Sequence, residues 1–194
     1  MTPHLLRAAD RLEQSWKNGG GVTREIACGP VGSGLAAFDW RVSLAEVSAP
    51  GPFSTFPGVD RTLSVLEGQL TLGFAVGDPV TLTHRSAPYA FAGDIACHGA
   101  PAGGPVVDLN VMVLRGRYRA QVERLEGNLW NPVGDINLLL ALGVVEMMAA
   151  QRRWDLHRYD AALVAAADLP GVRLFALRGP CITISLRREA SQAA

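Results

Sequence analysis

Residues 36–44 read Ala-Ala-Phe-Asp-Trp-Arg-Val-Ser-Leu, and apolar side chains occupy every second position of this stretch. The positions between them hold Ala37, Asp39, Arg41 and Ser43. Successive side chains of a β-strand point to opposite faces. This period of two therefore predicts a half-buried strand with one apolar face and one polar face.

The same signal recurs at short intervals along the chain. Val106–Leu114 alternates in the same way, and Val80–His84 follows a Gly-Asp-Pro turn. Only Glu67-Gly68 separates Leu63–Leu66 from Gln69–Phe74, which predicts a compact hairpin. Short strands with this spacing are typical of an antiparallel sandwich or barrel, so we expect an all-β protein.

Segments that do not alternate are expected to form loops. Residues 51–58 and 101–105 are rich in glycine and proline. No long amphipathic helix is predicted, although the alanine-rich residues 161–169 resemble one in composition.

A weak internal similarity suggests two lobes. Leu63–Leu72 aligns with Leu138–Met147, and each segment is followed by a strand that carries a His-Arg pair. The similarity favours two stacked β lobes, residues 1–130 and 131–194, with a boundary near residues 127–135. Chance resemblance and one continuous domain are the alternatives, because the spacing slips by a few residues.

Composition narrows the class of protein. The 194 residues include 18 basic and 18 acidic side chains, which argues against an electrostatic nucleic-acid binder. Three scattered cysteines without a CxxC pair are typical of reduced thiols in a cytoplasmic protein. The charged first 15 residues do not resemble a secretion signal, and the apolar residues 136–145 are too few to span a bilayer. We therefore expect a cytoplasmic protein that is not bound to a membrane.

Residues 16–25 read Trp-Lys-Asn-Gly-Gly-Gly-Val-Thr-Arg-Glu. Glycines can direct successive N–H groups towards an anion, and Lys17 could add a charge, Trp16 a flat wall, and Asn18 and Thr23 hydrogen bonds. The alternative is a flexible hinge before the first strand. The pattern matches neither a Walker A loop nor a dinucleotide fingerprint.

This stretch resembles the N-terminal signature of the HutD/Ves family, small bacterial cupin-like proteins often encoded with histidine-utilisation enzymes. Three further blocks follow in the family's order: Phe53-Ser-Thr-Phe-Pro-Gly-Val-Asp-Arg61, Phe91-Ala-Gly-Asp94 and Asp108-Leu-Asn-Val-Met112. The blocks span most of residues 16–115, and the last 80 or so residues carry no such motif. The resemblance implies a cupin fold, here bicupin-like.

Two of these blocks carry candidate ligand-binding groups. Arg61 follows an aromatic-proline-glycine turn, and its guanidinium could grip a carboxylate with two hydrogen bonds. Alternatively, Asp60 and Arg61 cap the loop, or Arg61 pairs with Glu25. Asp108, Asn110 and Met112 share one strand face, which would be an outer surface in an ordinary sandwich. The family resemblance favours the barrel interior, with Arg115 sharing the site.

The full set of candidate ligand-binding residues is polar and poor in nucleophiles. It comprises Trp16, Lys17, Asn18, Thr23, Glu25, Phe56, Arg61, Asp108, Asn110 and Met112. Such a set suits holding a small carboxylate metabolite. The resemblance implies urocanate or a formylated intermediate of histidine breakdown, and a role in tuning that pathway.

Three alternatives stay open. A metal-independent isomerase or lyase could use Glu25 as a general base on a small organic acid. A purely structural reading has the family blocks locking the two lobes together. A homodimer is compatible with an exposed barrel edge.

No metal or other cofactor is expected. The four histidines His4, His84, His98 and His157 lack the close spacing of metal ligands, although His98 could lie at a pocket mouth. Ser54 has no local base, so a nucleophilic site is not expected either.

Overall fold

The computed structural model describes residues 3–33, 37–149, 151–165 and 174–190. Within these ranges the strands pair in two antiparallel sheets, and the one helical element is the short 3-10 helix η1 (Ala8–Asp10). The all-β prediction is confirmed. No helix of the described residues is long and apolar enough to cross a bilayer.

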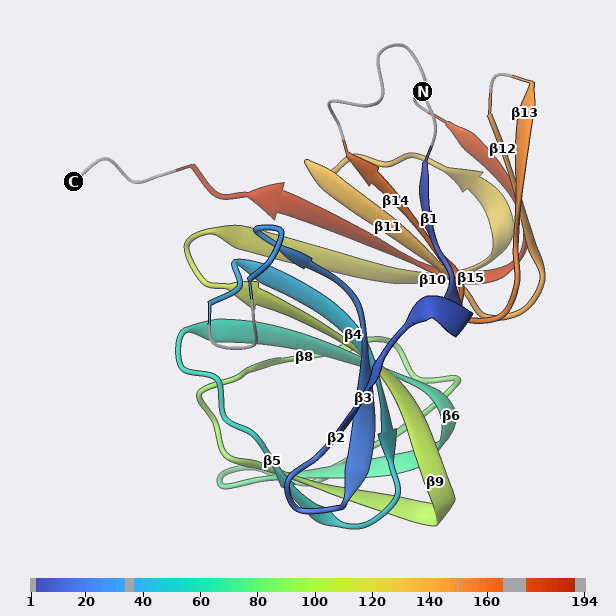
Figure 1. Ribbon diagram of the computed structural model, residues 1–194. Coiled ribbons are helices and arrows are strands. Elements are labelled where there is room, and N and C mark those ends of the chain that lie inside the picture. Colours follow the sequence, from blue (N-terminus) through green and yellow to red (C-terminus); the bar gives the residue numbers. More distant parts are fainter. Residues whose placement is uncertain (1–2, 34–36, 150, 166–173, 191–194) are drawn as a thin grey trace. The chain divides into compact units, whose positions relative to one another are not determined.

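The chain divides into two compact units, which are coloured along the sequence in Figure 1. The central unit is Leu12–Tyr118, and the terminal unit combines Met1–Arg11 with Arg119–Ala194. The N-terminal arm belongs to the terminal unit because β1 (His4–Leu6) pairs with β14 (Ala161–Ala165).

This division differs from the two lobes that the internal similarity of the sequence favoured, residues 1–130 and 131–194. The arm joins the later strands, and the junction lies at the start of β10 (Tyr118–Trp130). The pairing that recruits the arm joins residues far apart in sequence, so no local pattern could reveal it.

The central unit holds an eight-stranded sheet in the order β2-β3-β4-β9-β6-β7, with β5 paired to β9 and β8 paired to β6. Its strands are β2 (Glu13–Ser15), β3 (Gly21–Gly29), β4 (Trp40–Val47), β5 (Gly51–Phe53), β6 (Val59–Phe74), β7 (Val80–Thr83), β8 (Tyr89–Ala92) and β9 (Cys97–Leu114).

The expected hairpin at Glu67-Gly68 is instead a bulge inside the single long strand β6. The register with β9 slips on both sides of Glu67, and Gly68 has φ +80°. A glycine with positive φ suits a hairpin and a bulge equally, which is why the sequence prediction was wrong. Residues 101–105 are likewise not a loop, since they lie within β9 opposite this bulge.

The bulge divides the β6–β9 pair into two halves whose side chains meet in one core. Leu63, Val65 and Val106 from one half pack in the same buried cluster as Leu70 and Leu72 from the other.

The strand expected at residues 36–44 begins at Trp40, and Ala36 lies outside the described residues. Its polar face was expected to be solvated. Instead Arg41 is 6% exposed and Ser43 1%, while Val42 on the opposite face is 0% exposed. β4 is therefore buried on both faces, and it lies inside the sheet between β3 and β9.

The terminal unit has a seven-stranded sheet in the order β1-β14-β11-β15-β12-β13, with β10 paired to β15. Its remaining strands are β11 (Ile136–Ala141), β12 (Val145–Ala149), β13 (Arg152–Leu156) and β15 (Phe175–Arg188). The alanine-rich segment is strand β14 as far as Ala165, and residues 166–169 lie outside the described residues.

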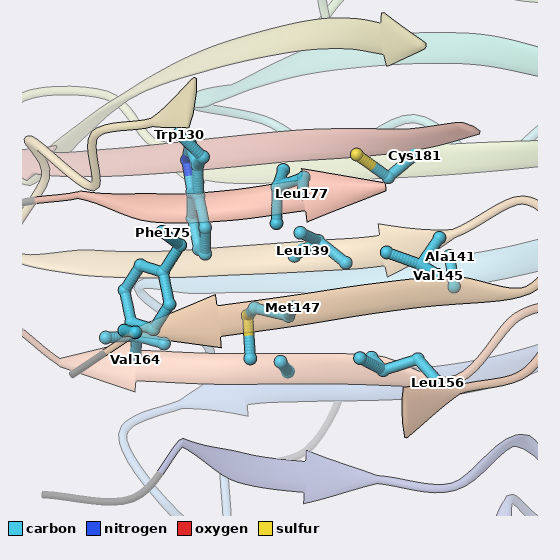
Figure 2. Packing of buried hydrophobic residues seen from close by; sticks show 12 residues of the cluster. Trp130, Leu139, Ala141, Val145, Met147, Leu156, Val164, Phe175, Leu177 and Cys181 are labelled. Carbon is cyan, nitrogen blue, oxygen red and sulfur yellow. The ribbon is translucent and has the colours of Figure 1, made fainter. Parts of the chain in front are cut away.

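Figure 2 shows the hydrophobic core of the terminal unit. Trp130 and Phe175 are in tilted contact, with ring centroids 5.4 Å apart. A buried polar group, Asn137, bonds both the N–H and the carbonyl of Gly134 at 2.8 Å and also accepts from the Ser185 hydroxyl. This hydrogen-bonded residue ties β11 to β15 beside an otherwise apolar core.

Candidate functional site

Four of the candidate residues, Arg61, Asp108, Asn110 and Met112, lie on one face of the neighbouring strands β6 and β9. In the sheet register, Met112 of β9 stands opposite Arg41 of β4 and opposite Arg61 of β6. Asn110 and Asp108 follow on the same side of β9 at alternate positions. Residues paired directly across strands share a face, and this face also carries the core of the central unit.

Arg61 is a cation enclosed by aromatic rings, with 5% of its surface exposed. Its guanidinium carbon lies 5.7, 5.6 and 5.0 Å from the ring centroids of Phe53, Phe56 and Phe91. Nη1 donates to the Ser54 carbonyl at 3.3 Å, and Nε has no hydrogen-bond partner among the described residues. The rings stabilise the charge and leave part of the hydrogen-bonding fork unused.

Asp108 is a carboxyl group buried near that cation. It is 1% exposed, and its Oδ1 has no hydrogen-bond partner in the described structure. Burial raises the pKa of Asp108 to about 7, and the positive charge of Arg61 partly opposes this rise. The buried Oδ1 of Asn110 also lacks a described partner. The face therefore gathers several buried polar atoms that no described residue satisfies.

The second arginine of the face is paired. Arg41 donates from Nε to Glu25 at 2.8 Å and from Nη1 to the Ser43 hydroxyl at 3.2 Å. Glu25 lies on β3, opposite Ser43 in the register. Glu25 thus forms its ion pair with Arg41 rather than with Arg61.

An aromatic wall borders these polar groups. The Trp16 indole N–H donates to the Thr23 hydroxyl at 2.8 Å, which fixes the ring beside β3. Trp16 meets Phe53 edge to face, with centroids 5.9 Å apart. Both rings border the core of the central unit, on the face that carries Arg61.

A surface clamp holds the loop that carries Phe56. The Gly58 N–H donates to Asp94 at 2.8 Å, and this bond together with Arg115 holds the pKa of Asp94 below its usual value. Arg115 bridges Asp94 and Asp60 at 2.8 and 2.7 Å. The sequence predicted that Arg115 shares the site. Arg115 is instead exposed, so it stabilises the loop and does not join the buried polar groups.

Two candidate residues lie away from this face. Lys17 and Asn18 are exposed in the turn after Trp16. The Gly19 N–H donates to the Trp16 carbonyl and the Gly20 N–H to Asn18 Oδ1, so these donors are engaged within the protein rather than directed at an anion. Gly21 serves close packing, since an added Cβ would lie 2.3 Å from the Glu46 carbonyl oxygen.

The described residues contain no group of three or more histidine, cysteine or acidic side chains that could hold a metal ion. His84, His98 and His157 are exposed. The described cysteines are free thiols, and Cys97 and Cys181 are buried. The arrangement offers hydrogen bonds and fixed charge to a ligand rather than a nucleophile.

Sequence reasoning missed several residues of the site: Arg41, Ser43, Phe53 and Phe91. Arg41 and Ser43 were assigned to the polar side of their strand, and this assignment could have indicated that they belong to the site. They share a face across the register with Met112 and Asn110, which the family blocks had already singled out. The two phenylalanines lie inside the quoted blocks but had no role until the position of Arg61 was known.

Comparisons with known proteins agree with this architecture. A profile of the HutD family matches residues 8–180. An uncharacterised 21.2 kDa protein from the hutC 3′ region of Pseudomonas putida is 35% identical over 167 residues, covering 84% of this chain and 87% of that protein. Protein Ves of Citrobacter koseri is 39% identical over 108 residues, which is 55% of this chain and 56% of Ves.

Solved structures show the same fold over nearly the whole chain. HutD from Pseudomonas fluorescens SBW25, in a formate condition, has a TM-score of 0.85 and 28% identity, covering 97% of this chain and 100% of that one. A Bacillus subtilis oxalate decarboxylase has a TM-score of 0.64 at 7% identity, covering 100% of this chain and 79% of that one, which supports the cupin fold alone. The chain therefore belongs to the HutD family.

Proposed function

We propose that this is a cytoplasmic protein that binds a small carboxylate metabolite at Arg61 and thereby tunes histidine breakdown. The observation that carries the proposal is the set of unsatisfied polar atoms around Arg61. Buried polar groups in proteins are nearly always hydrogen-bonded, so a group left without a partner calls for an explanation. A bound carboxylate would accept from the unpartnered Nε of Arg61 and remove that part of the deficit.

The aromatic surroundings of Arg61 favour a ligand over a structural ion pair. Phe53, Phe56 and Phe91 present ring faces, which hold a cation without neutralising it. A carboxylate that reaches the guanidinium would therefore meet an available positive charge in a dry environment. Electrostatic attraction is much stronger there than in water.

The link to histidine breakdown rests on family membership. The Pseudomonas putida relative is named for the hutC 3′ region, and the matching profile is that of HutD. The ligand proposed on this ground is urocanate or a formylated intermediate of that pathway.

An enzyme with Glu25 as its general base is the second candidate. Its supporting observation is that the Glu25 side chain is 37% exposed and lies beside the buried Ser43 and Arg41. However, the carboxylate already accepts a hydrogen bond from Arg41, which makes it a less available base. We therefore place binding ahead of catalysis.

A thermal-shift screen tests the proposal. The purified protein would be heated with urocanate, histidine, formiminoglutamate, N-formylglutamate or formate, with and without EDTA. A ligand that binds only the folded state stabilises it by RT ln(1 + [L]/Kd). We expect at least one of the acids to raise the melting temperature, and EDTA to leave the shift unchanged.

Two variants locate the site. Arg61→Met keeps an unbranched stem among the aromatic rings but removes the charge, so it should abolish the ligand-induced shift. Arg85→Met makes the same change at an exposed position of the central unit and should preserve the shift. If none of the acids raises the melting temperature of the wild type, the carboxylate ligand is refuted and the enzyme and structural readings remain.

A further inference from the structure

The second carboxyl group of the site, Asp108, has no role in simply gripping an anion. Its register neighbours are Ala45 on β4 and Val65 on β6, neither of which carries a side-chain hydrogen-bonding group. It is 1% exposed, and its Oδ1 has no partner among the described residues. A buried carboxylate is stable only when an opposite charge or several donors compensate it.

The charged and titratable groups that face Asp108 come from each neighbouring strand. They are Arg61 on β6, Arg41 on β4, Glu25 on β3, Tyr89 on β8 and Cys97 at the start of β9. Arg41 and Glu25 form an ion pair with each other. The positive charge of Arg61 is therefore what compensates an ionised Asp108, and electrostatic attraction between the two acts on the pKa of both.

A carboxylate bound to Arg61 would compete with Asp108 for that single positive charge. In a buried site with a single guanidinium, two carboxylates repel each other unless one of the acids is neutral. The acid that can be neutralised is Asp108, because a small metabolite carboxylate is held directly by Arg61. A protonated Asp108 also becomes a hydrogen-bond donor on the face that carries the unpartnered Oδ1 of Asn110.

We propose that the site takes up one proton with each carboxylate that it binds, and that Asp108 is the group that receives this proton. This inference rests on the proposed function and adds to it a dependence on pH. In the free protein, burial already raises the pKa of Asp108 to about 7. A second negative charge at Arg61 would raise this pKa further, so proton uptake on binding should be largest just above pH 7.

Calorimetric titration at pH 6.5, 7.5 and 8.5 tests the inference, with formate and N-formylglutamate as probes. Their titratable groups are carboxyls that stay ionised throughout this range. For the wild type we expect the affinity to fall up to about tenfold per pH unit above pH 7. At pH 8, titrations in phosphate and in Tris should differ in heat by the uptake of up to one proton per ligand.

Asp108→Asn mimics the protonated acid. We expect this variant to bind with the same affinity at pH 6.5 and 8.5, and with no difference between the buffers. Asp78→Asn, which changes an exposed carboxylate of the same unit, should retain the wild-type dependence on pH. If Asp108→Asn does not fold, the two-buffer measurement on the wild type still decides the matter.

The outcomes separate the two proposals. Binding of either probe with no proton uptake, or an Asp108→Asn variant with the wild-type pH dependence, overturns the proton-linked mechanism and leaves carboxylate binding standing. Failure of both probes, and of the other acids of the thermal screen, at every pH overturns carboxylate binding and the proton linkage with it.

Discussion

Asp108 should make the ligand-free protein less stable as the pH rises, which is opposite to the usual effect of a native carboxylate. Its folded-state pKa is about 7, whereas an unfolded aspartate titrates near its ordinary value of 3.8. Between these values the folded state holds a proton that the unfolded state has lost. The stabilisation is therefore fully present in acid and is lost as the pH rises through about 7.

The size of the effect follows from the same two values. Each pH unit in this window changes the unfolding free energy by about 1.4 kcal/mol. From pH 5 to pH 8 the loss amounts to roughly 2.5 kcal/mol, because it levels off above pH 7. A chain of this length should then melt about 5–10 °C lower at pH 8 on account of Asp108 alone.

Urea unfolding at pH 5, 6, 7 and 8 measures this contribution when wild type and Asp108→Asn are compared. The amide of Asp108→Asn cannot ionise, so the unfolding free energy of this variant should lack the pH dependence that Asp108 causes. The difference in unfolding free energy between the two proteins should therefore change by roughly 2.5 kcal/mol from pH 5 to pH 8. Equal m-values would show that the unfolded states are comparable. Parallel curves would refute the raised pKa, and a wild type that gains stability towards pH 8 would mean that Asp108 is held ionised by Arg61.

Three further changes test other parts of the fold. Asn137→Leu should lower the unfolding free energy by about 2–4 kcal/mol in urea denaturation, because it strands buried backbone groups that Asn137 now bonds. Cys181 is buried and its pKa is raised to about 12, so it should resist iodoacetamide in the native protein. The partly exposed Cys28 should be alkylated first, as mass spectrometry of the labelled protein would show. Gly29→Ala should depress the melting temperature in calorimetry, since its Cβ would lie 2.2 Å from the Trp40 indole nitrogen.

Alternation predicted which residues of a strand share a face, but it could not predict how that face is covered. Arg41 and Ser43 alternate with apolar neighbours as a surface strand would, yet both are buried. The alternating pattern is the same for a surface strand and for β4, because burial of the polar face depends on segments from elsewhere in the chain. The prediction that the polar face of β4 is solvated was therefore wrong because the local sequence carries no information on tertiary contacts, although the periodicity itself was identified correctly.

The shared face of Asp108, Asn110 and Met112 was predicted correctly from their spacing, and the structure adds its environment. No local feature distinguishes Asp108 from a surface aspartate, since its pKa depends on the surrounding burial and on Arg61. The glycine-rich turn shows the converse. Its family signature was recognised in the sequence, but its N–H groups bond within the protein.

The pairing of β1 with β14 also orders events during synthesis. A ribosome adding about 5–20 residues per second would expose His4 roughly 8–30 seconds before its partner Leu163. The central unit, whose contacts lie within Leu12–Tyr118, can complete its sheet during that interval. Strand β1 would thus leave the ribosome well before its partner, and it can reach its final place only after β14 has emerged.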